Sequence, residues 1–416
     1  MIDKVHVVGA GLAGLSAATL LAERGVSVIV SEAAGQAGGR CRSYIDPQLD
    51  MMIDNGNHLV LSGNRAVMAY LKRLGTQDRL AGPDSADLAF MDLRDGTRWR
   101  LRPNDGPLAW WVFARDRRVP ETGPADYLPL AALLVRHPGK RIDEVLKPGG
   151  VLWERLLQPF FLAALNTEAA AGSADLAGAV VRETLAKGGQ ACRPRIAQPT
   201  LSGAFVEPAL DYLAVRGAPV RLGRRLKTIV DDGHKITALE FGDGTAPVGS
   251  DDAVILAVPP NHAQALLPGL QAPDEFRSIV NGHFALPASE RPARAPLMTG
   301  LIGGAAEWLF VFEDRVSVTV SAADGIVDDH REHLAARLWA DVARVLDLGG
   351  KPMPPWQIVK ERRATFAATP EQDAKRPGAR TGLSNLFLAG DWTRTGLPAT
   401  IEGALRSGET AARLVL

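Results

Sequence analysis

The chain opens with the stretch Lys4-Val-His-Val-Val-Gly9-Ala-Gly11-Leu-Ala-Gly14, a G-x-G-x-x-G turn between an apolar run and an Ala/Leu-rich run. Gly9 permits a tight turn, Gly11 lets the backbone approach a ligand, and Gly14 allows a helix and a strand to pack closely. The N–H groups at the start of a helix attract an anion, and Leu12 and Ala13 occupy that position here. We therefore expect a strand, a turn that binds a dinucleotide pyrophosphate, and a helix.

An acidic residue completes the pattern at the end of the next strand. The predicted helix runs from about residue 12 to 24, Gly25 ends it in a left-handed conformation, and residues 26–31 form the second strand before Glu32. Glu32 lies 18 residues after Gly14, close to the spacing of about 20 at which an acid accepts a hydrogen bond from a ribose hydroxyl. This context favours dinucleotide binding over a glycine turn that only packs a helix.

The composition is typical of a globular enzyme and excludes several other classes. The chain has 416 residues, with 47 basic and 47 acidic side chains, so no global positive field attracts nucleic acid. Cys41 and Cys192 have no C-x-x-C spacing, which argues for a reducing compartment and against a disulfide frame or a metal site. No apolar run reaches the length of a membrane span. We expect a cytoplasmic protein, with contact to the inner face of the cytoplasmic membrane left open.

The pattern of secondary structure changes several times along the chain. Apolar residues at helical spacing predict helices over residues 151–158 and 174–185, and short strands joined by turns predict a strand meander over residues 219–258 that rejoins the first sheet. A helix is expected over residues 329–346, and a buried strand at residues 385–391 precedes a final helix.

Two interleaved domains account for this order. We expect a discontinuous nucleotide-binding domain and a substrate-binding cap. The first is built from residues 1–60, 205–274 and 381–416, and the second from residues 61–204 and 275–380.

The residues after Glu32 make the interpretation more specific. The stretch Glu32-Ala-Ala-Gly-Gln-Ala-Gly38-Gly39-Arg40 resembles the flavin amine oxidase and phytoene desaturase superfamily. The resemblance implies FAD as cofactor, with Glu32 on the adenosine ribose, Gly38 and Gly39 close to the pyrophosphate, and Arg40 supporting the phosphates. It also implies an α/β fold, a Rossmann-like FAD-binding domain of the flavin amine oxidase type with an interleaved α+β cap.

The end of the chain resembles the second FAD motif of the same superfamily. Gly390 and Asp391 follow an apolar strand, and the resemblance implies that Asp391 binds the ribityl chain. Thr400 and Ile401 begin the closing helix, whose N-terminus would point to the pyrimidine end of the flavin. No cysteine or histidine follows His333, so we expect the FAD to be bound non-covalently.

Within the superfamily the chain resembles the squalene-associated FAD-dependent desaturases, which include hydroxysqualene dehydroxylases of hopanoid biosynthesis. Four stretches carry the resemblance: Asp54-Asn-Gly-Asn-His58, Ala164-Leu-Asn-Thr167, Gly300-Leu-Ile-Gly-Gly with Glu307-Trp-Leu-Phe310, and Ala389-Gly-Asp-Trp392 continuing to Glu402. The family reaction is the reductive removal of the hydroxyl of hydroxysqualene, a long-chain isoprenoid, to give squalene. The sequence does not identify the electron donor.

Such a reaction needs a proton for the departing hydroxyl, and Asp54 and His58 are our catalytic candidates. They follow the Arg40 segment, which should return the chain toward the flavin. The alternative is that Asp54 caps a turn through Asn55-Gly56 and that His58 is a packed polar residue.

The segment 94–135 predicts contact with a membrane. Residues 94–118 hold seven arginines among four tryptophan and phenylalanine side chains, and an apolar helix is expected at residues 127–135. Arginine and tryptophan together suit anionic headgroups, while an apolar helix enters the acyl boundary. The alternative is a hairpin that turns at Asp95-Gly96 and carries solvated arginines.

Three other functions remain open from the sequence. A carotenoid-type desaturase would take hydride from a polyene on the same fold, and the sequence does not fix the direction of transfer. An amine oxidase is disfavoured because its polar entrance is commonly flanked by aromatic residues, whereas the four tyrosines are thinly spread. A prenyl-binding escort protein without redox chemistry would not need the intact FAD motifs.

Overall fold

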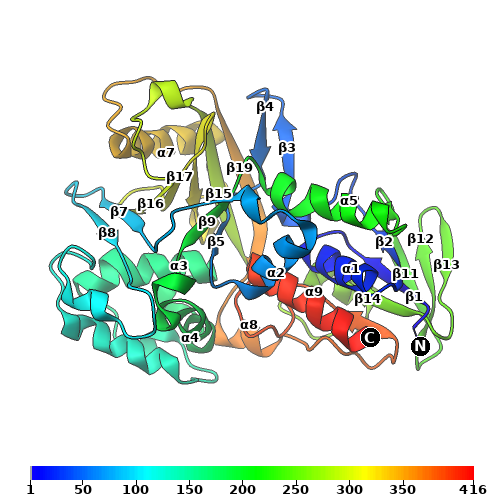
Figure 1. Cartoon of the computed structure of the whole chain (residues 1–416). Coiled ribbons are helices and arrows are strands. Elements are labelled where there is room, and N and C mark those ends of the chain that lie inside the picture. Colours follow the sequence, from blue (N-terminus) through cyan, green and yellow to red (C-terminus); the bar gives the residue numbers. More distant parts are fainter. Residues whose placement is uncertain (1) are drawn as a thin grey trace.

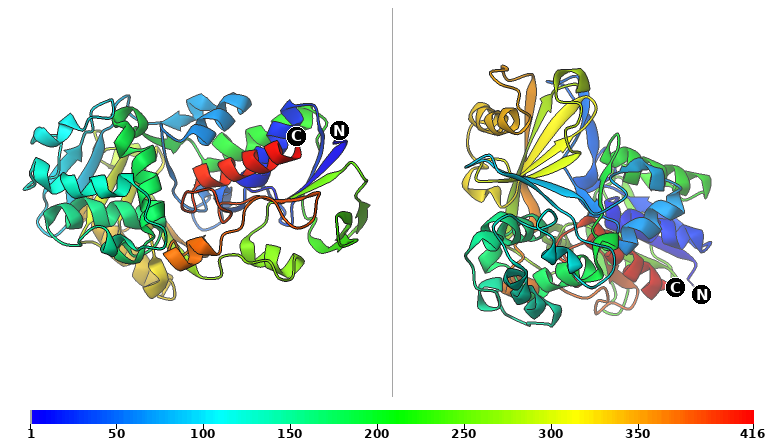
Figure 2. Two further views of the ribbon diagram at one scale, coloured as in Figure 1. Left: turned by 90° about the horizontal axis from the view of Figure 1, so that it is seen from below. Right: turned by 60° about the vertical axis from the view of Figure 1, so that its left-hand side comes forward.

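The computed structural model describes residues 2–416. It has a parallel-sheet unit that carries both chain ends, a mixed sheet beside it, and a helical region at the end of the molecule far from the termini (Figures 1 and 2). The mixture of parallel and antiparallel sheets with covering helices confirms the predicted α/β architecture.

The parallel sheet is assembled from distant parts of the chain. Its strand order is β10-β2-β1-β14-β20, and every neighbouring pair is parallel. The bounds are β10 Val220–Arg221, β2 Ser27–Ser31, β1 Lys4–Val8, β14 Ala253–Leu256 and β20 Leu386–Leu388. All four residues of β14 are buried, as is typical of a parallel strand covered on both faces.

Four helices complete this unit: α1 Leu12–Glu23, α2 Arg65–Leu74, α5 Glu207–Val215 and α9 Ile401–Val415. The predicted first helix is confirmed, and Gly25 after it has a φ of +78°. Helices α1 and α9 pack so closely that a Cβ on Gly408 would lie 2.1 Å from the carbonyl oxygen of Ala13. Because α2 packs on α5 and α9, residues 65–74 belong with this core rather than with the cap expected to begin at residue 61.

The predicted strand meander does not rejoin the first sheet as a whole. Only β10 and β14 do so, whereas β11 Leu226–Asp231, β12 Ile236–Phe241 and β13 Gly244–Pro247 form a separate antiparallel sheet. The physical reason is burial: most residues of β11 and β13 remain solvent-exposed, and an antiparallel sheet tolerates one wet face.

The second large sheet has seven strands in the order β19-β15-β18-β17-β16-β7-β8. The bounds are β19 Trp356–Phe366, β15 Phe276–Ala285, β18 Arg315–Val320, β17 Trp308–Val311, β16 Met298–Ile302, β7 Leu88–Asp92 and β8 Arg98–Leu101. Helix α7, Arg331–Val345, packs on one face through an aliphatic core, and the helix predicted over residues 329–346 is thereby confirmed. The hairpin predicted at Asp95-Gly96 is the connection between β7 and β8.

Small elements join the large ones. A hairpin of β3 Ser43–Asp46 and β4 Met51–Asp54 and a three-stranded sheet of β5 Leu59–Leu61, β9 Pro194–Ala197 and β6 Leu80–Ala81 lie between them. Two short helices, α6 Pro260–Leu266 and α8 Pro370–Ala374, lie in the connections toward the C-terminal part.

The helical region contains α3 Gln158–Leu165 and α4 Ala174–Glu183. The helix predicted over residues 151–158 instead contains a π-helical turn, Trp153–Leu157, before α3. Pro159 lies in the first turn of α3, and because proline lacks an N–H it cannot complete the preceding α-helical turn. The apolar helix predicted at residues 127–135 is wrong: Pro124–Leu134 forms 3₁₀ turns, with Pro129 inside them.

Candidate functional site

The glycine turn between β1 and α1 has the geometry of an open cradle. Gly9 has a φ of +107°, and a Cβ there would lie 2.4 Å from the carbonyl oxygen of Ala257. At Gly14 a Cβ would lie 1.9 Å from the carbonyl oxygen of Gly9. At Gly11, by contrast, a Cβ would meet nothing within 4 Å among the described residues. The first and third glycines are therefore required by the fold itself, and the second faces free space.

Helix α1 presents its N-terminus to this space. Gly11 is the N-cap and has no side chain to accept the first N–H groups, which belong to Leu12 and Ala13 in the opening turn. Backbone N–H groups at a helix N-terminus bind phosphate well, so the turn fits the pyrophosphate of a dinucleotide.

Glu32 lies beside the same turn, as the sequence predicts. One carboxylate oxygen accepts a hydrogen bond from the backbone N–H of Ala10 at 2.7 Å, and the other accepts one from Ala34 at 2.8 Å. Each carboxylate oxygen retains a second acceptor position. The side chain is thus fixed at the end of β2 with capacity left for ribose hydroxyls.

Gly38 and Gly39 close the cradle from the other side. The N–H of Gly38 donates to the carbonyl oxygen of Ala10 at 2.8 Å, and a Cβ on Gly39 would lie 3.5 Å from Cα of Gly11. Both glycines have positive φ, +106° and +56°. Their backbone therefore runs directly along the predicted phosphate position.

Arg40 joins the two ends of the sequence. One guanidinium nitrogen donates to both carboxylate oxygens of Asp391 at 2.7 Å, and another donates to the carbonyl oxygen of Ala364. Asp391 is nearly buried, whereas the Arg40 side chain is 43% exposed. Gly390 before it has a φ of +146°, and its N–H donates to Oγ of Ser407 in α9. The Arg40–Asp391 contact was not foreseen, because the sequence assigned the two residues to different parts of FAD.

The closing helix α9 begins as predicted. Oγ1 of Thr400 accepts a hydrogen bond from the N–H of Gly403 at 3.0 Å and caps the helix that starts at Ile401. The carboxylate of Glu402 accepts from the N–H groups of Ala66 and Val67 at 3.1 and 3.0 Å. A carboxylate at the N-terminus of α2 is electrostatically favourable, and it fixes α9 against α2.

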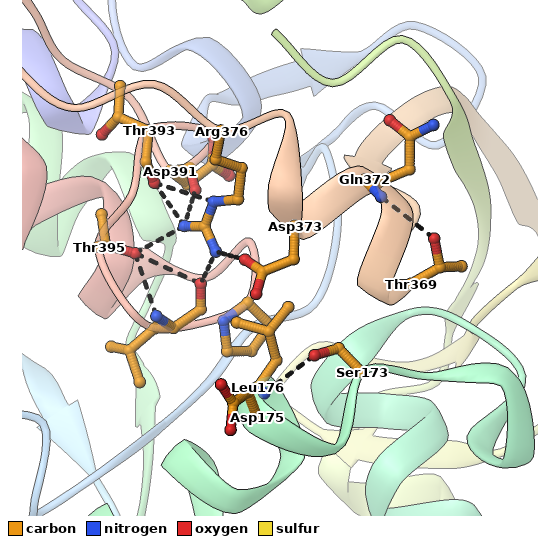
Figure 3. A network of polar contacts seen from close by, with 12 residues as sticks. Ser173, Asp175, Leu176, Thr369, Gln372, Asp373, Arg376, Asp391, Thr393 and Thr395 are labelled. Carbon is orange, nitrogen blue, oxygen red and sulfur yellow. Dashed lines mark hydrogen bonds and ion pairs between the residues drawn. The ribbon is translucent and has the colours of Figure 1, made fainter. Parts of the chain in front are cut away.

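Arg376 was missed by the sequence analysis and organises the segment that carries Asp391. Its side chain is fully buried and donates to carbonyl oxygens of residues 391, 393 and 397 (Figure 3). It also donates to Oγ1 of Thr395 at 2.9 Å and pairs with Asp373 at 3.0 Å. The buried arginine thus holds the loop after β20 in one conformation. An isolated arginine in a loop gives no sequence signal of this role.

The two catalytic candidates differ in their surroundings. Asp54 is 2% exposed, accepts hydrogen bonds from Oγ of Ser43 at 2.6 Å and the N–H of Leu201 at 2.9 Å, and lies 3.6 Å from Arg315. Burial raises the pKa of Asp54. These partners tie together β4, β18 and the segment before α5, which favours the structural alternative for this residue.

His58 lies next to the cradle. Burial, and the positive charge of Arg40 nearby, lower the pKa of His58 to about 4. The imidazole is therefore neutral near pH 7 and is a weak proton donor there. Among residues 2–416, no hydrogen bond or ion pair joins Asp54 to His58.

A second carboxyl group in this part of the structure belongs to Glu307. Burial raises the pKa of Glu307 to about 7, and its carboxylate accepts a hydrogen bond from the N–H of Ser321 at 2.8 Å. Its own N–H donates to the carbonyl oxygen of Thr319, whose hydroxyl contacts Asn57 in the segment of His58. In the sequence, Glu307 belonged to one of the stretches that carry the family resemblance and lay beside an apolar run, but neither feature reveals the burial of its carboxyl group.

Aromatic side chains line the face of the seven-stranded sheet opposite α7. Phe90 stacks on Trp99 with ring centroids 5.5 Å apart and meets the edge of Trp308 at 5.8 Å. These three side chains share one apolar core with Phe161 of α3. The space between the sheet and the helical region is therefore predominantly apolar.

Neither a metal-binding cluster nor a membrane-spanning helix is found among the described residues. Across residues 2–416, no cluster of three or more histidine, cysteine, aspartate or glutamate side chains could hold a metal ion. Within the same residues, every helix is too short or too polar to span a bilayer.

Residues 12–416 match the flavin containing amine oxidoreductase family, and the chain belongs to it. It is an FAD-dependent oxidoreductase, and the glycine cradle, Glu32 and the Arg40–Asp391 pair fit that cofactor.

Among curated relatives, hydroxysqualene dehydroxylase from Rhodopseudomonas palustris is 52% identical over 417 residues, covering 100% of this chain and 99% of the relative. Hydroxysqualene dehydroxylase from Sinorhizobium fredii is 51% identical over 416 residues, again covering 100% and 99%. A 15-cis-phytoene desaturase from Synechococcus elongatus is 22% identical, covering 99% of this chain and 96% of the relative. The resemblance stated from sequence is thereby confirmed, and the desaturases are more distant.

Solved structures support the fold. An oxidoreductase from Methanosarcina mazei superimposes with a TM-score of 0.73 at 15% identity, covering 99% of this chain and 100% of that one. A putrescine oxidase variant gives a TM-score of 0.69 at 18% identity, covering 99% of both chains. At this level of identity the comparison shows the shared fold alone.

Proposed function

We propose that this chain removes the hydroxyl of hydroxysqualene reductively and releases squalene. The observation that carries the proposal is the identity of 52% with a hydroxysqualene dehydroxylase along the whole length of both proteins. The match spans the FAD cradle as well as the apolar region between the second sheet and the helices. A prenyl-binding escort would not need the cradle, and the phytoene desaturases are less than half as similar.

We assign the FAD contacts to the residues predicted from sequence. Glu32 binds the adenosine ribose, and Asp391, held by Arg40 and Arg376, binds the ribityl chain. The pyrophosphate lies against the remaining residues of the cradle, which are Gly9, Gly11, Leu12, Ala13, Gly14, Gly38 and Gly39. Thr400 and Ile401 place the N-terminus of α9 at the pyrimidine end of the flavin, where a positive dipole stabilises negative charge.

The reaction replaces a C–O bond by a C–H bond. When bound and reduced, FAD supplies the hydride. The chain must provide a proton so that the hydroxyl leaves as water, and it must keep bulk water away from the carbon that receives the hydride. A hydrocarbon substrate offers few hydrogen-bonding groups, so the aromatic face with Phe90, Trp99 and Trp308 binds it by apolar contact.

Three residues are candidates for the proton donor. Asp54 and His58 follow from the sequence, and we add Glu307 because it keeps a substantial protonated fraction near pH 7. Replacing each in turn (Asp54→Asn, His58→Gln, Glu307→Gln) and measuring single-turnover reoxidation of the reduced enzyme separates them. The donor is the residue whose loss slows reoxidation while bound FAD is retained; an unchanged rate excludes that residue.

The decisive experiment is anaerobic. The purified enzyme is reduced, mixed with hydroxysqualene, and the product is identified by mass spectrometry while the flavin absorbance is followed. Reoxidation with formation of squalene in equal amount supports the proposal. Reoxidation only by oxygen or a quinone, after desaturation of a polyene, would instead establish the carotenoid-type alternative.

We also propose that the enzyme works in the cytoplasm, at the inner face of the cytoplasmic membrane. Support comes from Cys41 and Cys192, which are both buried and unpaired, as in a reducing compartment. A substrate of thirty carbons resides in the bilayer, so the enzyme must reach it there. Fractionation of cells that express a tagged enzyme tests this location.

A further inference from the structure

Exposed apolar side chains are concentrated in one short part of the helical region. Of the thirteen large hydrophobic residues that are exposed among residues 2–416, six lie between residues 108 and 135. They are Leu108, Trp110, Phe113, Leu128, Leu134 and Val135, with exposures of 63, 63, 65, 72, 48 and 60%. The segment lies at the end of the molecule opposite the termini (cyan in Figures 1 and 2). Packing in the protein interior therefore does not account for the apolar character of these exposed side chains.

The segment is held firmly from its inner side. Trp111 and Tyr127 are buried and meet edge to face with centroids 5.1 Å apart, and the Tyr127 hydroxyl accepts a hydrogen bond from the N–H of Val119 at 3.1 Å. The outer neighbours Trp110 and Phe113 lie 6.2 Å apart. The two 3₁₀ segments, Trp110–Phe113 and Pro124–Leu134, therefore present apolar residues to solvent on a fixed scaffold.

The structure narrows the membrane contact expected over residues 94–135. Four arginines of the β7–β8 hairpin are engaged by acidic side chains of the protein, so the alternative of a folded hairpin holds for them: Arg94, Arg98, Arg100 and Arg102. Trp99 is buried beneath them. The region that remains available for contact begins near residue 107.

Basic residues without ion-pair partners lie in or close to the same part of the chain. Arg115, Arg117, Lys140 and Lys147 are exposed, and none forms an ion pair within residues 2–416. The acidic groups on the same segments are Asp116, Glu121, Asp126, Asp143 and Glu144; of these, Glu121 pairs with Arg155, Asp126 accepts the N–H of Gly123, and Asp143 pairs with Arg141. Aromatic residues flanked by free cations suit an interface with anionic lipid headgroups.

A groove with a mixed polar and apolar lining opens beside this surface. It has a volume of about 370 Å³ and lies between the 3₁₀ segment Pro124–Leu134 and the π-helical turn. Besides Glu121, Thr122, Asp126 and Lys147, its lining includes Pro129, Leu146, Leu152, Trp153 and Leu157. The last four belong to the same buried core as Phe161 and Trp308 of the proposed substrate region. The apolar part of the groove lining is therefore continuous with the core that packs against the proposed substrate region.

We propose that residues 107–135, with the free cations Arg115, Arg117, Lys140 and Lys147, form a surface that docks on an anionic lipid bilayer next to this groove. This inference rests on the proposed function, because the substrate is a hydrocarbon stored in the membrane. It names the part of the enzyme that meets the membrane. The exposed side chains insert among the headgroups while the FAD unit and both termini remain on the aqueous side.

Sedimentation with vesicles tests the docking directly. The FAD-loaded enzyme is mixed with phosphatidylglycerol-containing vesicles at low salt, and the partition coefficient is compared with that for vesicles of phosphatidylcholine alone. We expect preferential binding to the anionic vesicles and weaker binding in high salt. The double variant Trp110→Ser with Phe113→Ser should bind at least about tenfold more weakly. Val215→Ser is the matched control, because Val215 is 85% exposed on α5, and it should bind like the wild type.

A turnover measurement separates this inference from the proposed reaction. The double variant should convert detergent-dispersed hydroxysqualene at the wild-type rate but be at least about tenfold slower with substrate in vesicles. If neither the wild type nor the double variant converts the dispersed substrate, the proposed reaction is wrong. The vesicle-binding measurement then still tests whether residues 107–135 dock on the membrane. Equal vesicle binding by the wild type and the double variant would overturn the inference. The inference would also be overturned if the wild type formed an oligomer that the double variant does not form, while vesicle binding stayed the same.

Discussion

Two single-methyl substitutions in the glycine turn should separate folding from FAD binding. At Gly14, an alanine Cβ would lie 1.9 Å from a backbone oxygen of Gly9 that cannot rotate away. Overpacking of this kind costs about 1–3 kcal/mol or more, and the gain in helix propensity of about 1 kcal/mol offsets it only in part. Gly14→Ala should therefore lower the free energy of unfolding by about 2 kcal/mol even without FAD.

Gly11→Ala should behave in the opposite way. Gly11 has a φ of −73°, which any residue can adopt, and a Cβ there meets nothing within 4 Å among the described residues. The free energy of unfolding without FAD should change by less than about 1 kcal/mol. The methyl group occupies the predicted phosphate position and removes at least one charge-assisted hydrogen bond, worth about 1.5–3 kcal/mol. The dissociation constant of FAD should then rise roughly 10- to 100-fold.

The assay combines urea unfolding of the FAD-free proteins, followed by tryptophan fluorescence, with titration of FAD by quenching of its fluorescence. FAD binding by Gly11→Ala as tight as that of the wild type would contradict the predicted phosphate position. Unfolding of FAD-free Gly14→Ala at the wild-type urea concentration would mean that the turn has more room than the structure shows.

Three further predictions concern single residues. Arg376→Lys removes at least two buried hydrogen bonds and should lower the free energy of unfolding by about 3 kcal/mol. The control is Arg362→Lys, at an arginine whose side chain is 61% exposed, and it should change the free energy of unfolding by less than about 0.5 kcal/mol. Thermal unfolding with and without FAD checks both variants. Glu307 has a pKa of about 7 in the folded protein, above its ordinary value of 4.5, so its contribution to stability is complete below pH 4.5 and is lost as the pH rises through 7, by at most about 3 kcal/mol. Unfolding measured from pH 5 to 8 should therefore depend less on pH in Glu307→Gln, and parallel curves for the two proteins would contradict the assigned burial. Thr400→Ala removes the N-cap of α9 and should cost about 1 kcal/mol, with a loss of FAD affinity by fluorescence titration if α9 contacts the flavin; unchanged affinity would place that helix away from the cofactor.

The contacts at the two FAD motifs explain why distant segments act together. Arg40 comes from the N-terminal part and Asp391 from the C-terminal part, and they form a charge-assisted pair at 2.7 Å. Arg376 donates hydrogen bonds to the backbone carbonyl oxygens of Asp391 and Thr393. The carboxylate of Glu402 meanwhile links α9 to the N-terminus of α2. Each of these contacts positions one part of the cradle by means of another part. We therefore expect the loss of any one contact to weaken FAD binding by more than the free energy of that contact alone.

The sequence alone determined the local features of the nucleotide unit. The strand, the glycine turn and helix α1 follow from apolar spacing and from the conformational freedom of glycine, which act within a few residues of one another. The spacing from Glu32 to Arg40 and the ending at Asp391 added the family and its cofactor. Elements failed to follow the sequence pattern where a proline intervened, as at Pro129 and Pro159, or where a strand could pair in more than one sheet.

Only the tertiary structure decided which polar groups meet and which of them ionise. The sequence shows only that Glu307 and Asp54 are acids and that His58 is an imidazole. Burial gives Glu307 a pKa of about 7 and His58 a pKa of about 4. Hydrogen bonds from Ser43 and Leu201 occupy the carboxylate of Asp54. The proton affinity of a group depends on its desolvation and on neighbouring charges. Some of those neighbours are distant in the chain, as Leu201 and Arg315 are from Asp54, so no local pattern contains them. The exposure of the apolar side chains near Trp110 also depends on the tertiary structure. The sequence shows that these residues are apolar, but not whether the fold buries them or leaves them on the surface.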